Sequence, residues 1–204
     1  LGQAVLAFVA LLKLPHTAGI IVLSFVCYAS FITLRGLWLG PLLIERHGFS
    51  LVQSGNVALA VSAVSLVGPA LFGRFDPGGT ARQRRLVGFS LLLAGLFVAM
   101  ALAHSAAVDV GVSLAIGLLS GYMVLQYADV RSSYPAAMTG RAMSVFTMAL
   151  FLGVALMQWI TGVAASTAKA QGAEPYAVVM FTIAGMLALG AAAFRWLPAP
   201  RQQV

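Results

Sequence analysis

Charge is what this chain has least of. Only 8% of its 204 residues are Asp, Glu, Lys or Arg, against about 25% in soluble globular domains. Residues 48–73 contain no charged side chain, and between Arg85 and Arg131 the only charges are Asp109 and Asp129. A soluble domain of this size could not cover such stretches, whereas runs of about 20 apolar residues match the hydrocarbon thickness of a bilayer. The scarcity of charge therefore predicts an integral membrane protein.

The sequence also lacks the residue patterns that catalysis and cofactor binding require. Its one cysteine, Cys27, cannot form an intrachain disulfide. The three histidines lie near the expected helix ends without metal-ligand spacing, and none stands in mid-helix where it could act as a base. Neither a phosphate-binding Gly-x-x-x-x-Gly-Lys motif nor a Thr-Val-Gly-Tyr-Gly potassium filter occurs. We therefore expect no enzyme, no cofactor and no metal site.

What the sequence has in abundance is apolar segments of membrane-spanning length. They are apolar on every face and do not alternate, which favours α-helices over barrel strands. We expect six transmembrane helices, at 19–44, 51–72, 86–103, 108–128, 140–165 and 176–196. We predict three segments: a linker or an interfacial helix at 1–17, the six-helix bundle at 18–197 and a cytoplasmic tail at 198–204. The predicted fold class is an all-α membrane protein.

The basic residues predict the orientation of this bundle. One side holds nine of them: Lys13, Arg74, Arg82, Arg84, Arg85, Arg131, Arg141, Arg195 and Arg201. The opposite loops hold only Arg46 and Lys169. Because cytoplasmic loops retain an excess of Lys and Arg, both termini are predicted to be cytoplasmic. The same rule explains the net charge of +7 without a nucleic-acid partner.

Arg35 is the remaining cation, and it lies inside the first predicted span. Placing a guanidinium in hydrocarbon costs from about 3 to over 10 kcal/mol, so the side chain needs water or a partner. It either snorkels to the outer end of the helix, or contacts an anion or lines a wet cavity. Tyr28 and Trp38 lie on roughly the same helical face, and we predict that they share this cavity with Arg35.

The residues after Arg35 are unusual for a transmembrane helix. Gly36 and Gly40 form a small-xxx-small pair that would let another helix approach closely. Pro41 removes a helical hydrogen bond and predicts a kink or a break. Broken spans beside binding sites recur in secondary transporters. Simple helix packing is the alternative explanation of the same residues.

Other polar and small residues inside the spans could line the substrate cavity or could serve helix–helix contacts. Gln126 and Gln158 are added to the predicted substrate cavity because long amides are costly against lipid. An interhelical hydrogen bond of about 0.6–2 kcal/mol is the alternative for either one. Four further glycines are interpreted as packing positions: Gly117, Gly121, Gly153 and Gly162.

Charged residues at the predicted cytoplasmic ends of the spans form another group. We predict that Asp76, Arg85, Asp129 and Arg141 make ion pairs that break and form as a cytoplasmic gate moves. The alternative is a solvated rim that faces the lipid headgroups.

Several short motifs carry a family resemblance. They are Trp38-Leu39-Gly40-Pro41, Gly140-Arg141-Ala142 and Gln158-Trp159. Together with the six spans and a basic second loop, they make residues 19–196 resemble the C-terminal half of a bacterial major facilitator superfamily transporter. The loop at 73–85 is only loosely similar to the family's Gly-x-x-x-Asp-Arg-x-Gly-Arg-Arg motif, because the aspartate stands one residue early and Pro77 replaces the arginine.

The resemblance implies an architecture and a location. Two six-helix halves would rock about a central cavity that binds a small-molecule substrate near the midplane of a bacterial inner membrane. Each half would consist of two inverted three-helix repeats, here at about 19–104 and 108–196. The N-terminal half would be missing from this chain, or a second copy would take its place.

Two hypotheses of function follow. The first is a secondary active transporter of a small solute, of which this chain is one half. No predicted span carries a mid-membrane carboxylate, so a proton carrier would belong to the other half. The alternative is a stand-alone membrane scaffold or homodimeric channel-like protein without a transport cycle. Further apolar spans encoded upstream of Leu1 would favour the transporter, and a start codon there would favour the alternative.

Overall fold

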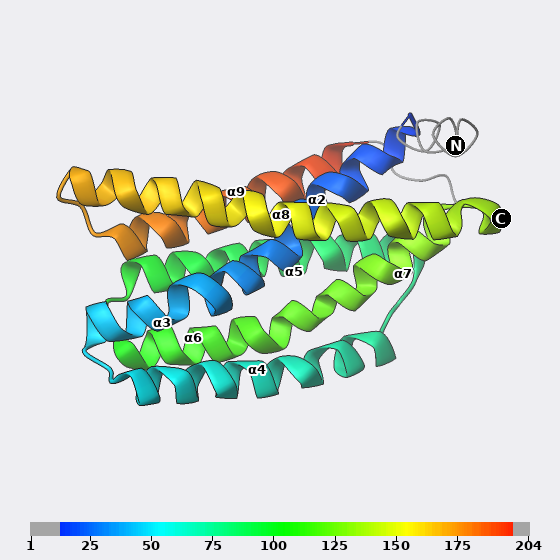
Figure 1. Cartoon of the computed structure of the whole chain (residues 1–204). Helices are drawn as coiled ribbons and strands as arrows, with labels where there is room; N and C mark the ends of the chain where they lie inside the picture. The colour runs from blue at the N-terminus through cyan, green and yellow to red at the C-terminus, as the bar shows by residue number, and fades with distance from the viewer. Residues whose placement is uncertain (1–12, 198–204) are drawn as a thin grey trace.

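The computed structural model describes residues 13–197, and all regular structure in that range is helical. The predicted tail 198–204 and most of the predicted interfacial segment 1–17 lie outside the described residues. Six helices are long and apolar enough to cross a membrane, which confirms the expected number and the all-α membrane class. Figure 1 shows an elongated bundle in which α2 (Pro15–Thr33) begins at the end where α9 (Pro175–Trp196) finishes.

The first span is one helical path from Pro15 to Arg46. It runs through α2, the π-helical turn η1 (Leu34–Trp38), α3 (Leu39–Pro41) and a second π-helical turn, η2 (Leu42–Arg46). The next spans are α4 (Leu51–Arg74), α5 (Gly79–Leu102), α6 (Ala106–Leu119) with its continuations η3 (Ser120–Tyr122) and α7 (Met123–Ser133), and α8 (Ala136–Ala170). Each predicted helix is present and is longer than the apolar pattern indicated, the last by a single residue.

The largest shift of a single boundary is at the start of the third span, which begins at Gly79 and not at residue 86. The basic stretch before Leu86 is helical because arginine and glutamine are good helix formers, so charge ends the apolar run without ending the helix. Gly78 precedes the helix with a φ of 68°, a backbone conformation that glycine adopts without strain. The chain reverses at Gly78, which places the basic first residues of α5 beside the end of α4.

Of the kink or break predicted at Pro41, the structure shows no break. The span continues through Pro41, which lies between the two π-helical turns. A π-helical turn holds an extra residue and can absorb the hydrogen bond that proline lacks. A Cβ added to Gly36 would meet nothing within 4 Å. No described helix therefore packs closely against Gly36, and Gly40 has only an ordinary contact with Ser54.

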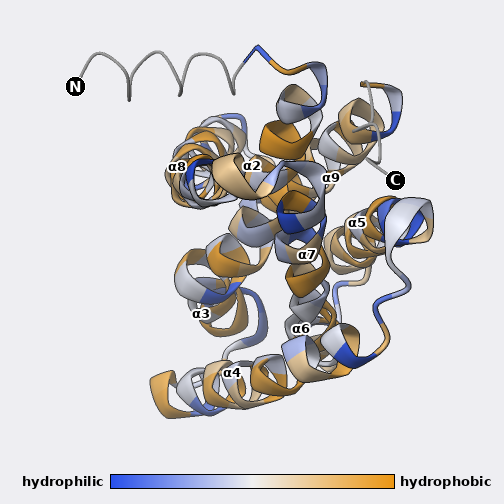
Figure 2. Cartoon of the chain, turned by 90° about the vertical axis from the view of Figure 1, so that its right-hand side faces the viewer, coloured by the Kyte–Doolittle hydropathy of each residue, from blue (hydrophilic) through white to orange (hydrophobic). Residues whose placement is uncertain are grey.

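The helices divide into a buried centre and an exposed edge. In the first span 67% of the most apolar stretch is buried, against 11% in α4. α2 packs against α8 and α9, whereas α6, η3 and α7 pack against α4, and α5 contacts α9. Figure 1 shows α4 at the lower edge of the bundle, where Leu59 and Leu66 are exposed. Hydrophilic residues gather instead at helix ends, as on α5, α7 and α8 in Figure 2, and the apolar outer faces suit a lipid solvent.

Glycines permit the closest helix crossings. A Cβ on Gly121 of η3 would overlap the backbone of Gly68 on α4, and one on Gly153 of α8 would overlap the carbonyl of Phe25 on α2. At Gly117 a Cβ would lie 2.9 Å from the Val61 carbonyl oxygen. These contacts confirm the predicted packing roles of Gly117, Gly121 and Gly153. The same prediction is wrong for Gly162, which faces open space within the described chain.

Substitution of Gly153 tests the α2–α8 crossing. Gly153→Val forces two backbones apart, and we expect it to lower the free energy of unfolding by about 1–3 kcal/mol, the usual cost of overpacking. Gly162→Val is the matched control on the same helix and should change stability little, because its added atoms meet no neighbour. Thermal unfolding of the purified protein in detergent measures both. Equal effects of the two substitutions would contradict the crossing.

Candidate functional site

Arg35 is hydrogen-bonded to the neighbouring span but has no acidic partner among the described residues. Its Nη1 donates a hydrogen bond to Ser62 Oγ on α4, at 2.6 Å, and its Cζ lies 6.0 Å from the centroid of the Phe31 ring. The residue is exposed, and no ion pair within residues 13–197 includes it. A guanidinium has five N–H donors, so most of its hydrogen-bonding capacity is unused on this face.

An open groove of about 270 Å³ reaches Phe31, the residue whose ring the Arg35 guanidinium contacts, although Arg35 itself does not line the groove. Its walls include Tyr28 and Phe31 from α2, Ser65 from α4 and Tyr127 from α7. Phe31 also contacts the guanidinium, and Ser65 Oγ donates to the Ser62 carbonyl at 2.7 Å. Aromatic walls and a few convergent polar groups are the usual lining of small-molecule sites. Of the predicted cavity residues, Tyr28 lines the groove, and Arg35 meets its edge through the Phe31 ring.

The other three predicted cavity residues are placed differently. Trp38 is half-buried, where its Nε1 donates to Thr161 Oγ1 at 3.0 Å and its ring meets Tyr176 edge-on. Gln126 is buried beside Cys27, and Gln158 is half-buried on α8. None of the three lines the groove next to Arg35. Sequence spacing could not show this, because it places residues on a helical face without showing which helices cover that face.

The charges at the other end of α4 and α5 do not pair as predicted. Asp76 accepts hydrogen bonds from Arg82, with Nε 2.8 Å from Oδ1 and Nη2 2.6 Å from Oδ2. Arg85, which we had expected in the gate, donates instead to the Phe75 carbonyl at 2.6 Å. Asp76 also accepts from the backbone N–H of Gly78, and this turn carries the carboxylate to the first turn of α5, within reach of Arg82. The Arg82 hydrogen bonds hold the pKa of Asp76 below its ordinary value.

Arg82 extends this contact to a third helix. Its Nη1 donates to Ser132 Oγ near the end of α7 at 2.9 Å, close to the buried Asp129. Arg141 is exposed on α8 and makes no side-chain hydrogen bond to the described residues. Asp76 and Asp129 of the predicted gate thus adjoin a single arginine, whereas Arg85 and Arg141 do not join them. The predicted list omitted Arg82, although its buried side chain connects α5 to α7.

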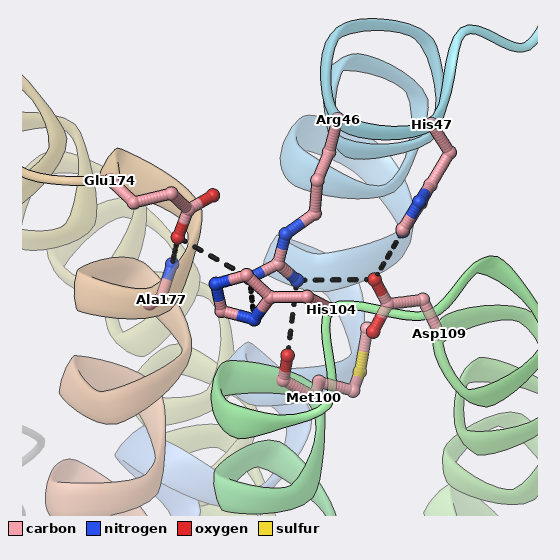
Figure 3. Close-up of polar contacts among 7 residues, drawn as sticks. All are labelled: Arg46, His47, Met100, His104, Asp109, Glu174 and Ala177. Atoms are coloured by element: carbon pink, nitrogen blue, oxygen red, sulfur yellow. Dashed lines mark hydrogen bonds and ion pairs between the residues drawn. The ribbon is translucent and has the colours of Figure 1, made fainter.

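The densest polar cluster is at the opposite end of the bundle (Figure 3). Arg46 Nη1 lies 3.1 Å from Asp109 Oδ2 and donates to the Met100 carbonyl at 3.1 Å. His47 Nε2 lies 2.7 Å from the same carboxylate oxygen. Arg46 Nη2 reaches Glu174 Oε2 at 3.4 Å. The cluster joins the end of the first span to α5, α6 and α9.

Burial makes the Arg46 cluster structurally important. The Asp109 side chain is 0% exposed and that of Arg46 is 7% exposed, so each charge depends on the other. Sequence reasoning placed these residues near helix ends and did not pair them. One signal in the sequence could have paired them. The predicted spans place Arg46, Asp109 and Glu174 at the same face of the membrane, where a cation and nearby carboxylates stabilise one another.

The polar contacts described above pair helices at both ends of the bundle. Within residues 13–197 no group of three or more His, Cys, Asp or Glu side chains could hold a metal ion. Comparison with protein-family models, with curated proteins and with solved structures finds no match of any of the three kinds. The case for a function therefore depends on the groove, the charges and the helix arrangement themselves.

A double-mutant cycle tests the buried Arg46–Asp109 pair. Arg46→Met and Asp109→Leu each strand one buried charge, and we expect each to lower the free energy of unfolding by about 3–5 kcal/mol. The double variant should lose much less than the sum of the two. Arg131→Met, which removes an exposed cation that has no partner among residues 13–197, is the control and should change little. Denaturant unfolding of the purified protein provides the values, and strict additivity would argue against the pair.

Proposed function

We propose that this chain is one half of a secondary active transporter, which moves a small solute by alternating access. The observation that carries the proposal is the unpaired Arg35 guanidinium beside an aromatic-lined groove in a membrane helix. A charge at such depth is costly unless it faces water or a polar ligand. A groove open on one side supports a solute path whose other wall is supplied by a second bundle.

The pairing of the helices supports the inverted repeats that the family resemblance implies. The contact of α2 with α8 has a counterpart in the contact of α4 with α6 and η3. Likewise α2 packs on α9 as α6 packs on α5, and α5 and α9 contact each other. These correspondences are those expected if the first three spans and the last three are two copies of one unit. The large exposed apolar surface of α4 fits a contact with the other half.

The proposal includes an orientation and a coupling scheme. Both ends of the described chain lie at the end of the bundle where most cations gather, which supports cytoplasmic termini in a bacterial inner membrane. The buried carboxylates Asp109 and Asp129 lie toward the ends of their span, one beside Arg46 and the other beside Arg82. Neither stands next to the groove, so we assign proton coupling, if protons drive the cycle, to the other half.

Transport by the complete protein tests the role of Arg35. A transported solute is first found by comparing what cells with and without the protein accumulate from a defined metabolite mixture. We then expect Arg35→Ala to lower the initial rate for that solute about tenfold or more, since a charged hydrogen bond contributes about 1.5–3 kcal/mol. Arg35→Lys should recover part of the rate, because it keeps the charge and loses the planar fork.

Lys169→Ala is the matched control, because it removes an exposed cation at the end of α8 and should leave the rate unchanged. Wild-type rates in Arg35→Ala would refute the site. If no solute moves under any gradient and the purified chain forms a stable homodimer through α4, the scaffold alternative replaces the transporter.

A further inference from the structure

A second pocket, of about 220 Å³, lies between the start of α5 and the end of α9. Residues 80, 83, 84 and 87 of α5 line one wall, and this spacing places them along one helical face. Phe194, Arg195 and Leu197 line the opposite wall. The pocket thus has one guanidinium on each side, Arg84 and Arg195, with apolar surface from Val87 and Phe194 between them.

Arg84 differs from the two arginines beside it, which both have partners, in having none among the described residues. Arg82 is bonded to Asp76, and Arg85 donates to the Phe75 carbonyl. Arg84 makes no side-chain hydrogen bond or ion pair with any residue of 13–197, and the same holds for Arg195. Two like charges that face one pocket without a carboxylate repel each other. An anion bound between them would remove that cost.

The position of the pocket indicates which anion is available. α5 begins and α9 ends at the cation-rich end of the bundle, onto which Figure 2 looks. The ends of membrane-spanning helices lie at the level of the lipid headgroups, and basic pockets between such helices bind anionic headgroups. A volume of about 220 Å³ is below the roughly 300–1,000 Å³ of pockets that enclose drug-sized ligands. It suits a headgroup whose acyl chains remain in the bilayer.

We propose that the α5–α9 pocket binds the phosphate-bearing headgroup of an anionic phospholipid. Arg84 and Arg195 contact the phosphate from opposite helices, and charge-assisted bonds of this kind are the stronger hydrogen bonds of proteins. Val87, Phe194 and Leu197 contact the apolar part of the lipid next to the headgroup. The lipid thereby joins the start of α5 to the end of α9. The site is separate from the groove beside Arg35 and does not depend on the transport proposal.

Lipid binding to the complete protein in detergent tests this site. Native mass spectrometry counts the lipids bound from phosphatidylglycerol and from phosphatidylcholine with the same acyl chains. We expect preferential retention of phosphatidylglycerol by the wild type. The double variant Arg84→Ala/Arg195→Ala should bind it about thirtyfold more weakly, since each basic residue near a membrane surface contributes about 1 kcal/mol. Arg84→Lys/Arg195→Lys should recover part of the affinity.

The control is Arg131→Ala/Arg141→Ala, which removes two exposed, unpartnered cations at the same end and matches the change in net charge. It should lose much less affinity than the pocket variant. Equal losses in the two double variants would overturn the proposal in favour of general surface charge. Equal binding of the two lipids by the wild type would also overturn it. Displacement of phosphatidylglycerol by millimolar inorganic phosphate would assign the pocket to a free anion and not to a lipid.

Discussion

Hydrocarbon cannot solvate a guanidinium, and the arrangement of this bundle is governed by where each arginine meets that constraint. Arg46 satisfies it inside the protein, against a fully buried carboxylate at one end of the bundle. Arg82 satisfies it against Asp76 at the other end. Arg35 has only the hydroxyl of Ser62 and the edge of an aromatic groove. The cost of an unpaired charge in lipid is several kcal/mol. The proposed solute path therefore requires the face that carries Arg35 to be wet.

Arg46 and Arg82 hold the ends of the bundle together, whereas Arg35 lies in its middle part. The Arg46 cluster joins the end of the first span to α5, α6 and α9, and Arg82 joins α5 to α7. Ends that are held by buried charges leave the middle of the bundle to be shaped by apolar packing and close glycine crossings. The groove beside Arg35 lies in that middle part, where α2 and α4 meet η3 and α7. A fixed frame around an open, aromatic-lined groove is compatible with the proposed role as a transporter half.

The sequence predicted the number and approximate limits of the helices because lipid imposes length and hydropathy on every span. It also predicted the packing glycines at 117, 121 and 153. It failed where the answer depended on residues far apart in the chain. The partner of Arg46 is Asp109, 63 residues away, and no local pattern marks such a pair. Pro41 left a kink or a break open, and the two π-helical turns keep the span helical there. Trp38 shares the predicted face with Arg35, but Thr161 and Tyr176 draw it into the interior.

The central claim is that the face carrying Arg35 is exposed to water within the membrane, and cysteine accessibility tests it most directly. Single cysteines replace Ser65, which lines the groove, and Leu189, an exposed apolar residue of α9, in a Cys27→Ser background of the complete protein. Both positions lie well inside their spans. A charged, membrane-impermeant thiol reagent should modify the cysteine at 65 readily and leave the one at 189 unmodified. If position 65 is as protected as position 189, the groove faces acyl chains, and the account of Arg35 is wrong.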